Sequence, residues 1–108
     1  MYKPELTVEQ YHRRNHGVIT RARNRLFNLE LRMISASAND RARIIRIANL
    51  MAESMVVVRA REKLAVTLTN DQEYVPYFNM FSDETMLIYK RCKRIAGGGK
   101  MKSETMNE

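Results

Sequence analysis

The chain has 108 residues, of which 44% are apolar, and a formal net charge of +7 at pH 7. This length predicts a single domain, and this apolar fraction is enough for a packed core and excludes a wholly disordered chain. The single cysteine excludes an intramolecular disulfide and is typical of a reducing compartment. The polar N-terminus lacks a signal-peptide pattern and no apolar run approaches membrane-spanning length, so we expect a cytoplasmic protein that does not cross a membrane.

The first predicted helix begins near Thr7 and continues to about Ser35. Residues 7–10 read Thr-Val-Glu-Gln, the form of a capping box that satisfies backbone N–H groups at a helix start. Apolar or small residues then recur at alternating steps of three and four, a heptad seam with one polar member: Val8, Tyr11, Asn15, Ile19, Ala22, Leu26, Leu29 and Met33. Gly17 costs such a helix roughly 1 kcal/mol, and it marks either a bend or a close contact with another helix.

The second predicted helix runs from about Asp40 to Leu68, with Asn39 or Asp40 as its N-cap. One face carries a seam of Ile44, Ile47, Ala48, Met51, Met55, Val58 and Ala65. A narrower row lies nearly opposite and consists of Leu50, Val57, Leu64 and Leu68. A helix that is apolar on two sides is typical of the middle element of a bundle. Three consecutive valines at 56–58 also fit a short strand, but the flanking pattern favours the helix.

Residues 69–81 are predicted to form a connection, because Asn70, Asp71 and Pro76 interrupt the apolar period. The connection is rich in aromatic residues, including Tyr77 and Phe78, and we expect it to lie at the open end of the bundle near Tyr2 and Tyr11. Two roles remain open for it. It can be a plug that seals the bundle end, or its aromatic rings can anchor a protein partner or stack on bases.

The third predicted helix begins at Ser82, and Asp83 and Glu84 complement its N-terminal dipole. Its seam is Thr85, Ile88, Cys92 and Ile95, and Gly97 ends it. Residues 98–108 are predicted to be a mobile tail beyond the single domain, residues 1–97.

These elements predict an all-α fold, a long antiparallel coiled-coil-like helical hairpin completed by a shorter third helix into a three-helix bundle. The third helix, about 20 Å long, is expected to cover only part of the second apolar row of the middle helix. The uncovered part, around Leu50 and Val57, predicts self-association or a partner helix, and a homodimer is the symmetric default. The predicted interface residues are Leu50, Val57, Leu64, Leu68, Tyr77 and Phe78.

Four arginines fall on one line along the first helix, because steps of seven, four and seven return to nearly the same azimuth. They are Arg14, Arg21, Arg25 and Arg32. Thirteen of the nineteen basic residues are arginine, whose planar fork can grip phosphate or carboxylate in a bidentate way. This stripe predicts binding to an anionic partner, and nucleic acid is the first candidate.

Further basic residues are expected to extend the stripe. Candidate nucleic-acid contacts are the stripe itself with Arg13 and Arg23 beside it, Arg41, Arg43 and Arg46 at the hairpin end, and the cluster Lys90, Arg91, Lys93 and Arg94. The cluster has a second interpretation, since cations complement a helix C-terminus. The stripe has one too, as residues that flank a coiled-coil seam and pair with Glu30, Glu53 or Glu62.

Catalytic and metal sites are not predicted by any motif. His12 and His16 have the four-residue spacing with which two imidazoles can share a metal, but no third ligand completes a site. The sequence therefore predicts a non-enzymatic binding protein without cofactor or metal. The alternative is an adaptor or inhibitor that docks its basic face on an acidic protein, for example within a nucleic-acid-processing complex.

Overall fold

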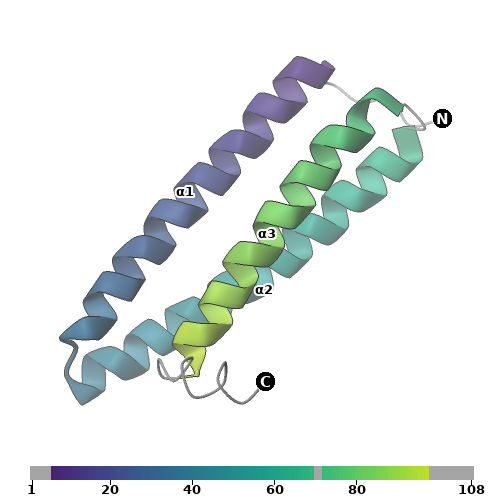
Figure 1. Cartoon of the computed structure of the whole chain (residues 1–108). Helices are drawn as coiled ribbons and strands as arrows, with labels where there is room; N and C mark the ends of the chain where they lie inside the picture. Colours follow the sequence, from purple (N-terminus) through teal and green to yellow (C-terminus); the bar gives the residue numbers. More distant parts are fainter. Residues whose placement is uncertain (1–5, 70–71, 98–108) are drawn as a thin grey trace, which may run out of the picture.

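Three helices make up the computed structural model, which describes residues 6–69 and 72–97 (Figure 1). α1 spans Val8–Ile34, α2 spans Ala38–Thr69 and α3 spans Val75–Ala96, with the short 3-10 helix Gln72–Tyr74 before α3. No strand occurs in the described ranges, so the predicted all-α three-helix bundle is confirmed. The predicted tail, residues 98–108, lies outside the described residues. None of the described helices has the length and apolarity of a membrane span.

α1 begins with the predicted capping box. The Thr7 hydroxyl accepts a hydrogen bond from the Gln10 backbone N–H at 3.1 Å, and the Gln10 side chain accepts one from the Thr7 backbone N–H at 2.9 Å. The helix then continues through Gly17 to Ile34 without interruption. A Cβ atom at Gly17 would lie 3.3 Å from Nη1 of Arg21, the far end of a flexible side chain.

Gly17→Ala is therefore expected to stabilise the protein by about 0.5–1 kcal/mol, because glycine costs a helix interior that much relative to alanine. The Arg21 guanidinium has to move by only a few tenths of an ångström to make room. Urea denaturation of the two proteins measures the difference. A loss of stability would mean that the helix depends on glycine at this position.

α2 begins two residues earlier than predicted. Ser37 precedes the first helical residue, Ala38, and its hydroxyl accepts a hydrogen bond from the Asp40 backbone N–H at 3.2 Å. The predicted caps, Asn39 and Asp40, are thus wrong by two or three residues, since three neighbouring small polar residues all suit a cap. The three valines at 56–58 lie inside α2, so the strand alternative is wrong as well.

α3 begins at Val75, seven residues before the predicted start at Ser82. Pro76 lies in its first turn, where a missing N–H costs nothing because the first helical N–H groups have no partner in the helix. Most of the predicted connection is therefore helical, and α3 has 22 residues. At about 1.5 Å per residue it is about 33 Å long, so the predicted length of about 20 Å is wrong.

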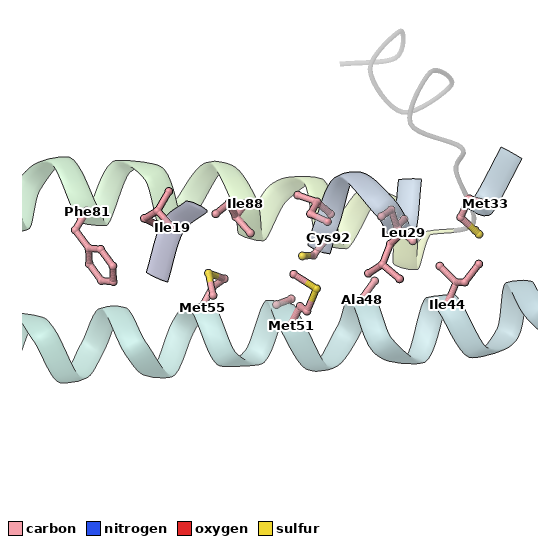
Figure 2. Close-up of a cluster of buried hydrophobic side chains, with 13 residues drawn as sticks. Ile19, Leu29, Met33, Ile44, Ala48, Met51, Met55, Phe81, Ile88 and Cys92 are labelled. Carbon is pink, nitrogen blue, oxygen red and sulfur yellow. The ribbon is translucent and has the colours of Figure 1, made fainter. Parts of the chain in front are cut away.

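The three helices run up, down and up. Arg23 pairs with Glu84 and Glu30 pairs with Arg91, and both pairs have the same sequence separation of 61, so α1 and α3 are parallel. α2 is antiparallel to both and packs most closely on α3. Figure 2 shows the side chains of α2 that face those of α3 and α1 in the core. Leu26, Ile44, Ile88 and Cys92 are at most 2% exposed, and the predicted seam of α3 is buried throughout.

The second apolar row of α2 is not covered by α3. Exposed fractions are 57% for Leu50, 57% for Val57, 59% for Leu64 and 49% for Leu68. The prediction that the third helix covers part of this row is therefore wrong, because α1 and α3 both pack on the seam side of α2. The whole row faces away from the described core.

Candidate nucleic-acid interface

The arginine stripe lies along a continuous helix. Arg21, Arg25 and Arg32 are exposed, and none of them makes a hydrogen bond or an ion pair with another described residue. Since each residue adds about 1.5 Å to a helix, the stripe from Arg14 to Arg32 is about 27 Å long. Three free guanidinium groups thus stand in a row beside the buried face of α1.

Arg14, the fourth member of the stripe, is tied to the protein. Its Nη2 donates to Oε1 of Glu62 at 2.8 Å, and the guanidinium lies 5.5 Å from the centre of the Tyr11 ring. The Glu62 side chain is 11% exposed, whereas that of Arg14 is 48% exposed. The alternative interpretation, in which stripe residues pair with Glu62, therefore holds for Arg14, although about half of the Arg14 side chain is still exposed.

Buried polar groups surround this pair. The Tyr11 hydroxyl and the Asn15 amide nitrogen are buried and have no hydrogen-bond partner among the described residues. Burial raises the pKa of the Tyr11 hydroxyl above its usual value, and the negative charge of Glu62 adds to the shift. The Arg14 guanidinium, 2.8 Å away, brings a compensating positive charge to the Glu62 carboxylate.

Two arginines of α2 lie level with the ends of the stripe. The contacts of Arg14 with Glu62 and of Arg41 with the Met33 carbonyl fix the antiparallel register. In that register Arg43 lies level with Arg32, and Arg61 lies level with Arg14. Both are exposed, and they point away from the side of α2 that contacts α3 through Arg59.

The arginines of the stripe on α1 and these two arginines of α2 are called the basic face from here on. Its members are Arg14, Arg21, Arg25, Arg32, Arg43 and Arg61.

Other predicted nucleic-acid contacts are used within the fold. Arg23 pairs with Glu84, and Arg91 forms a bidentate pair with Glu30 at 3.0 and 2.6 Å, which raises the pKa of Arg91. The structure therefore places Arg23 and Arg91 between α1 and α3, on another side of α1 from the stripe.

The other predicted cations do not form one surface. Arg13 lies 3.7 Å from Glu9, and Lys93 donates to Asn49 at 3.3 Å. Arg43, which belongs to the basic face, also lies 3.7 Å from Asp40. Arg41 donates to the Met33 carbonyl at 3.2 Å and so caps the end of α1. Arg46, Lys90 and Arg94 are exposed, but they lie off the basic face.

The aromatic residues of the predicted connection lie beside α1. Tyr74 is buried, meets Tyr11 edge to face at 5.2 Å and donates its hydroxyl to the Leu6 carbonyl at 2.7 Å. Tyr77 and Phe78 are half-buried, and the Tyr77 ring lies 4.7 Å from that of His12. These contacts fit a plug at the bundle end; Tyr2, its other predicted neighbour, lies outside the described residues.

His12 and His16 line a cleft of about 210 Å³ between α1 and α3, with Tyr77 and Glu84 on the opposite wall. No group of three metal-binding side chains occurs among the described residues. Cys92 is fully buried, and burial raises the pKa of its thiol to about 11, so the thiol is neutral and packs as an apolar group.

One exposed apolar group was missed by the sequence analysis. Phe27, Leu31 and Ile34 are 54%, 49% and 80% exposed and follow one line along the end of α1. Their steps of four and three, off the predicted seam, are the signal that could have found them.

Comparison of the chain with protein-family models, curated proteins and solved structures gives no match. The function must therefore be argued from geometry and charge. Three free arginines in a row, with Arg43 and Arg61 opposite them, can bind the oxygens of several successive anionic groups.

Proposed function

We propose that the protein is a non-enzymatic, cytoplasmic nucleic-acid-binding accessory protein that grips the phosphate backbone with its basic face. The observation that carries the proposal is the row of Arg21, Arg25 and Arg32, exposed and free of partners among the described residues. Guanidinium groups bind phosphate oxygens in a bidentate way and remain charged at every physiological pH.

The shape of the face supports backbone binding rather than the reading of base sequence. α1 is a 27-residue helix whose buried residues run from Tyr11 to Met33, so its exposed arginines lie along the side of the bundle. Recognition of base edges in a groove uses a protruding helix or ribbon, whereas phosphate contacts need only charge at regular spacing. The proposal therefore assigns the protein an affinity for nucleic acid with little sequence preference.

The salt dependence of binding tests this proposal. With about four or five phosphates neutralised on a DNA duplex, the affinity should fall with a logarithmic slope of about −4, or about 250-fold between 50 and 200 mM salt. Fluorescence anisotropy with a labelled duplex and with an RNA duplex of the same length measures the slope. Absence of binding at low salt, or an affinity that is indifferent to salt, would contradict the proposal and favour an acidic protein as the partner of the basic face.

A further inference from the structure

The second apolar row of α2 is a surface without a partner in the described structure. Leu50, Val57 and Leu64 follow one another at intervals of seven residues, and Leu68 continues the line. Each of the four side chains is about half exposed or more. From Leu50 to Leu68 the row is about 27 Å long, which corresponds to five turns of helix. An exposed apolar stripe of this length is typical of an interaction site.

The first half of the row, Leu50 and Val57, lines a shallow groove with charged residues beside it. The groove is lined by Leu50, Glu53, Ser54, Val57, Val58 and Arg61. Arg43 and Arg61 share an azimuth on the edge of the row that faces away from α3, and Arg46 lies near its start. Glu53 is the acidic residue on the opposite edge. Three arginines against one glutamate make the surroundings of the row positive.

The charges and the apolar side chains together restrict what can cover the row. A second copy of the chain related by a two-fold axis would bring three arginines from each protomer to one interface, which disfavours the predicted homodimer through this face. A nucleic-acid backbone would satisfy the arginines and leave four large apolar side chains in water.

We infer that the outer face of α2 binds an amphipathic helix of another protein, with apolar residues along its centre and acidic residues at its edges. A helix laid along α2 presents side chains at the same interval of seven residues as Leu50, Val57 and Leu64. Its acidic residues meet Arg61 at the groove and Arg43 and Arg46 near the start of the row. This partner surface shares Arg43 and Arg61 with the basic face, but it does not include Arg21, Arg25 and Arg32 on α1.

A designed peptide tests this inference on the full chain. The probe is a labelled helical peptide of about three heptads with leucine at its central positions and glutamate at the flanking positions. We expect saturable binding in the micromolar range by fluorescence anisotropy. The combined variant Leu50→Ser, Val57→Ser and Leu64→Ser should weaken binding by at least about 30-fold, because buried anchors supply most of the affinity of such an interface.

A matched variant controls for general stickiness. Phe27→Ser, Leu31→Ser and Ile34→Ser remove equally exposed apolar side chains from α1 and should leave peptide binding unchanged. A peptide with lysine in place of glutamate should bind at least about tenfold more weakly. Circular dichroism should show that both variants fold, because the substituted positions are exposed.

The inference would be overturned if the glutamate peptide failed to bind, if the Leu50, Val57 and Leu64 variant (the α2 variant) bound it unchanged, or if the lysine peptide bound equally well. A dimer of the unbound protein in sedimentation that the α2 variant dissociates would overturn it too. The α2 variant keeps Arg21, Arg25 and Arg32, so its affinity for duplex DNA should equal that of the unmodified protein. Failure of this inference is thereby distinguishable from failure of the proposed nucleic-acid binding.

Discussion

Replacement of Arg21, Arg25 and Arg32 by glutamine in one variant is expected to lower the affinity for a DNA duplex between about 10² and 10³-fold at about 0.1 M salt. Each lost phosphate contact reduces the logarithmic salt slope by about 0.9, so the slope should become shallower by about 2.7. The three side chains are exposed and make no hydrogen bond or ion pair with another described residue, so the variant should keep its stability. Anisotropy titrations at several salt concentrations measure both quantities.

A second triple variant distinguishes the effect of arginine position on DNA affinity from the effect of net charge. Lys63→Gln, Lys90→Gln and Arg94→Gln remove the same charge from exposed positions off the basic face. This variant should lose only the small affinity due to the lower overall potential and keep its salt slope. Equal losses in the two triple variants would mean that binding depends on total charge and that the row on α1 has no special role.

Arg14→Ala is expected to destabilise the protein by about 1.5–3 kcal/mol, although Arg14 belongs to the same stripe. The variant leaves the carboxylate of Glu62, whose side chain is 11% exposed, without its partner at 2.8 Å. Removal of one partner of a fully buried pair costs about 3–5 kcal/mol, and the half-exposed position of Arg14 reduces that cost because water screens the pair. Urea denaturation at neutral pH measures the loss.

A double-mutant cycle assigns this loss to the ion pair. Glu62→Gln in the Arg14→Ala background should restore much of the lost stability, because it removes the unpaired charge. Arg21→Ala, at an exposed position of the same stripe without a described partner, should change stability by less than about 0.5 kcal/mol. If Arg14→Ala and Arg21→Ala cost the same, the pair with Glu62 does not stabilise the fold.

The parts of the fold that depend on local sequence could be predicted. The capping box at Thr7 and Gln10 and the seam of α1 need only neighbouring residues, and both are present in the structure. The start of α3 could not be predicted in the same way. Pro76 is typical of a helix break, and Ser82 with Asp83 is typical of a helix start, so the sequence favours a start at Ser82. Proline is also well suited to the first turn of a helix, which is where the structure has it. In the structure the rings of Tyr74 and Tyr77 contact Tyr11 and His12 of α1, contacts between distant residues that the local sequence does not predict.

In the candidate site, too, the features that depend on one helix could be predicted, and those that depend on contacts between helices could not. The azimuths of Arg21, Arg25 and Arg32 follow from helix geometry alone, and the structure keeps them exposed. The partners of Arg14 and Arg23 lie 48 and 61 residues away, so they depend on the register between helices. The charge pattern of one helix does not show which of its arginines pair with acidic residues of another helix. The basic face on α1 therefore lacks Arg23, which the sequence analysis included and which pairs with Glu84 of α3.

The central claim is that phosphate lies against the basic face, and NMR of the arginine side chains tests it most directly. Titration of isotope-labelled protein with a DNA duplex follows the Nε–Hε signals of individual arginines. We expect the signals of Arg21, Arg25 and Arg32 to shift with a common saturation, together with those of Arg43 and Arg61, while that of Arg94 stays unchanged. Shifts confined to Arg94 and its neighbours on α3, or no shift in the Arg21, Arg25 and Arg32 row, would contradict the account.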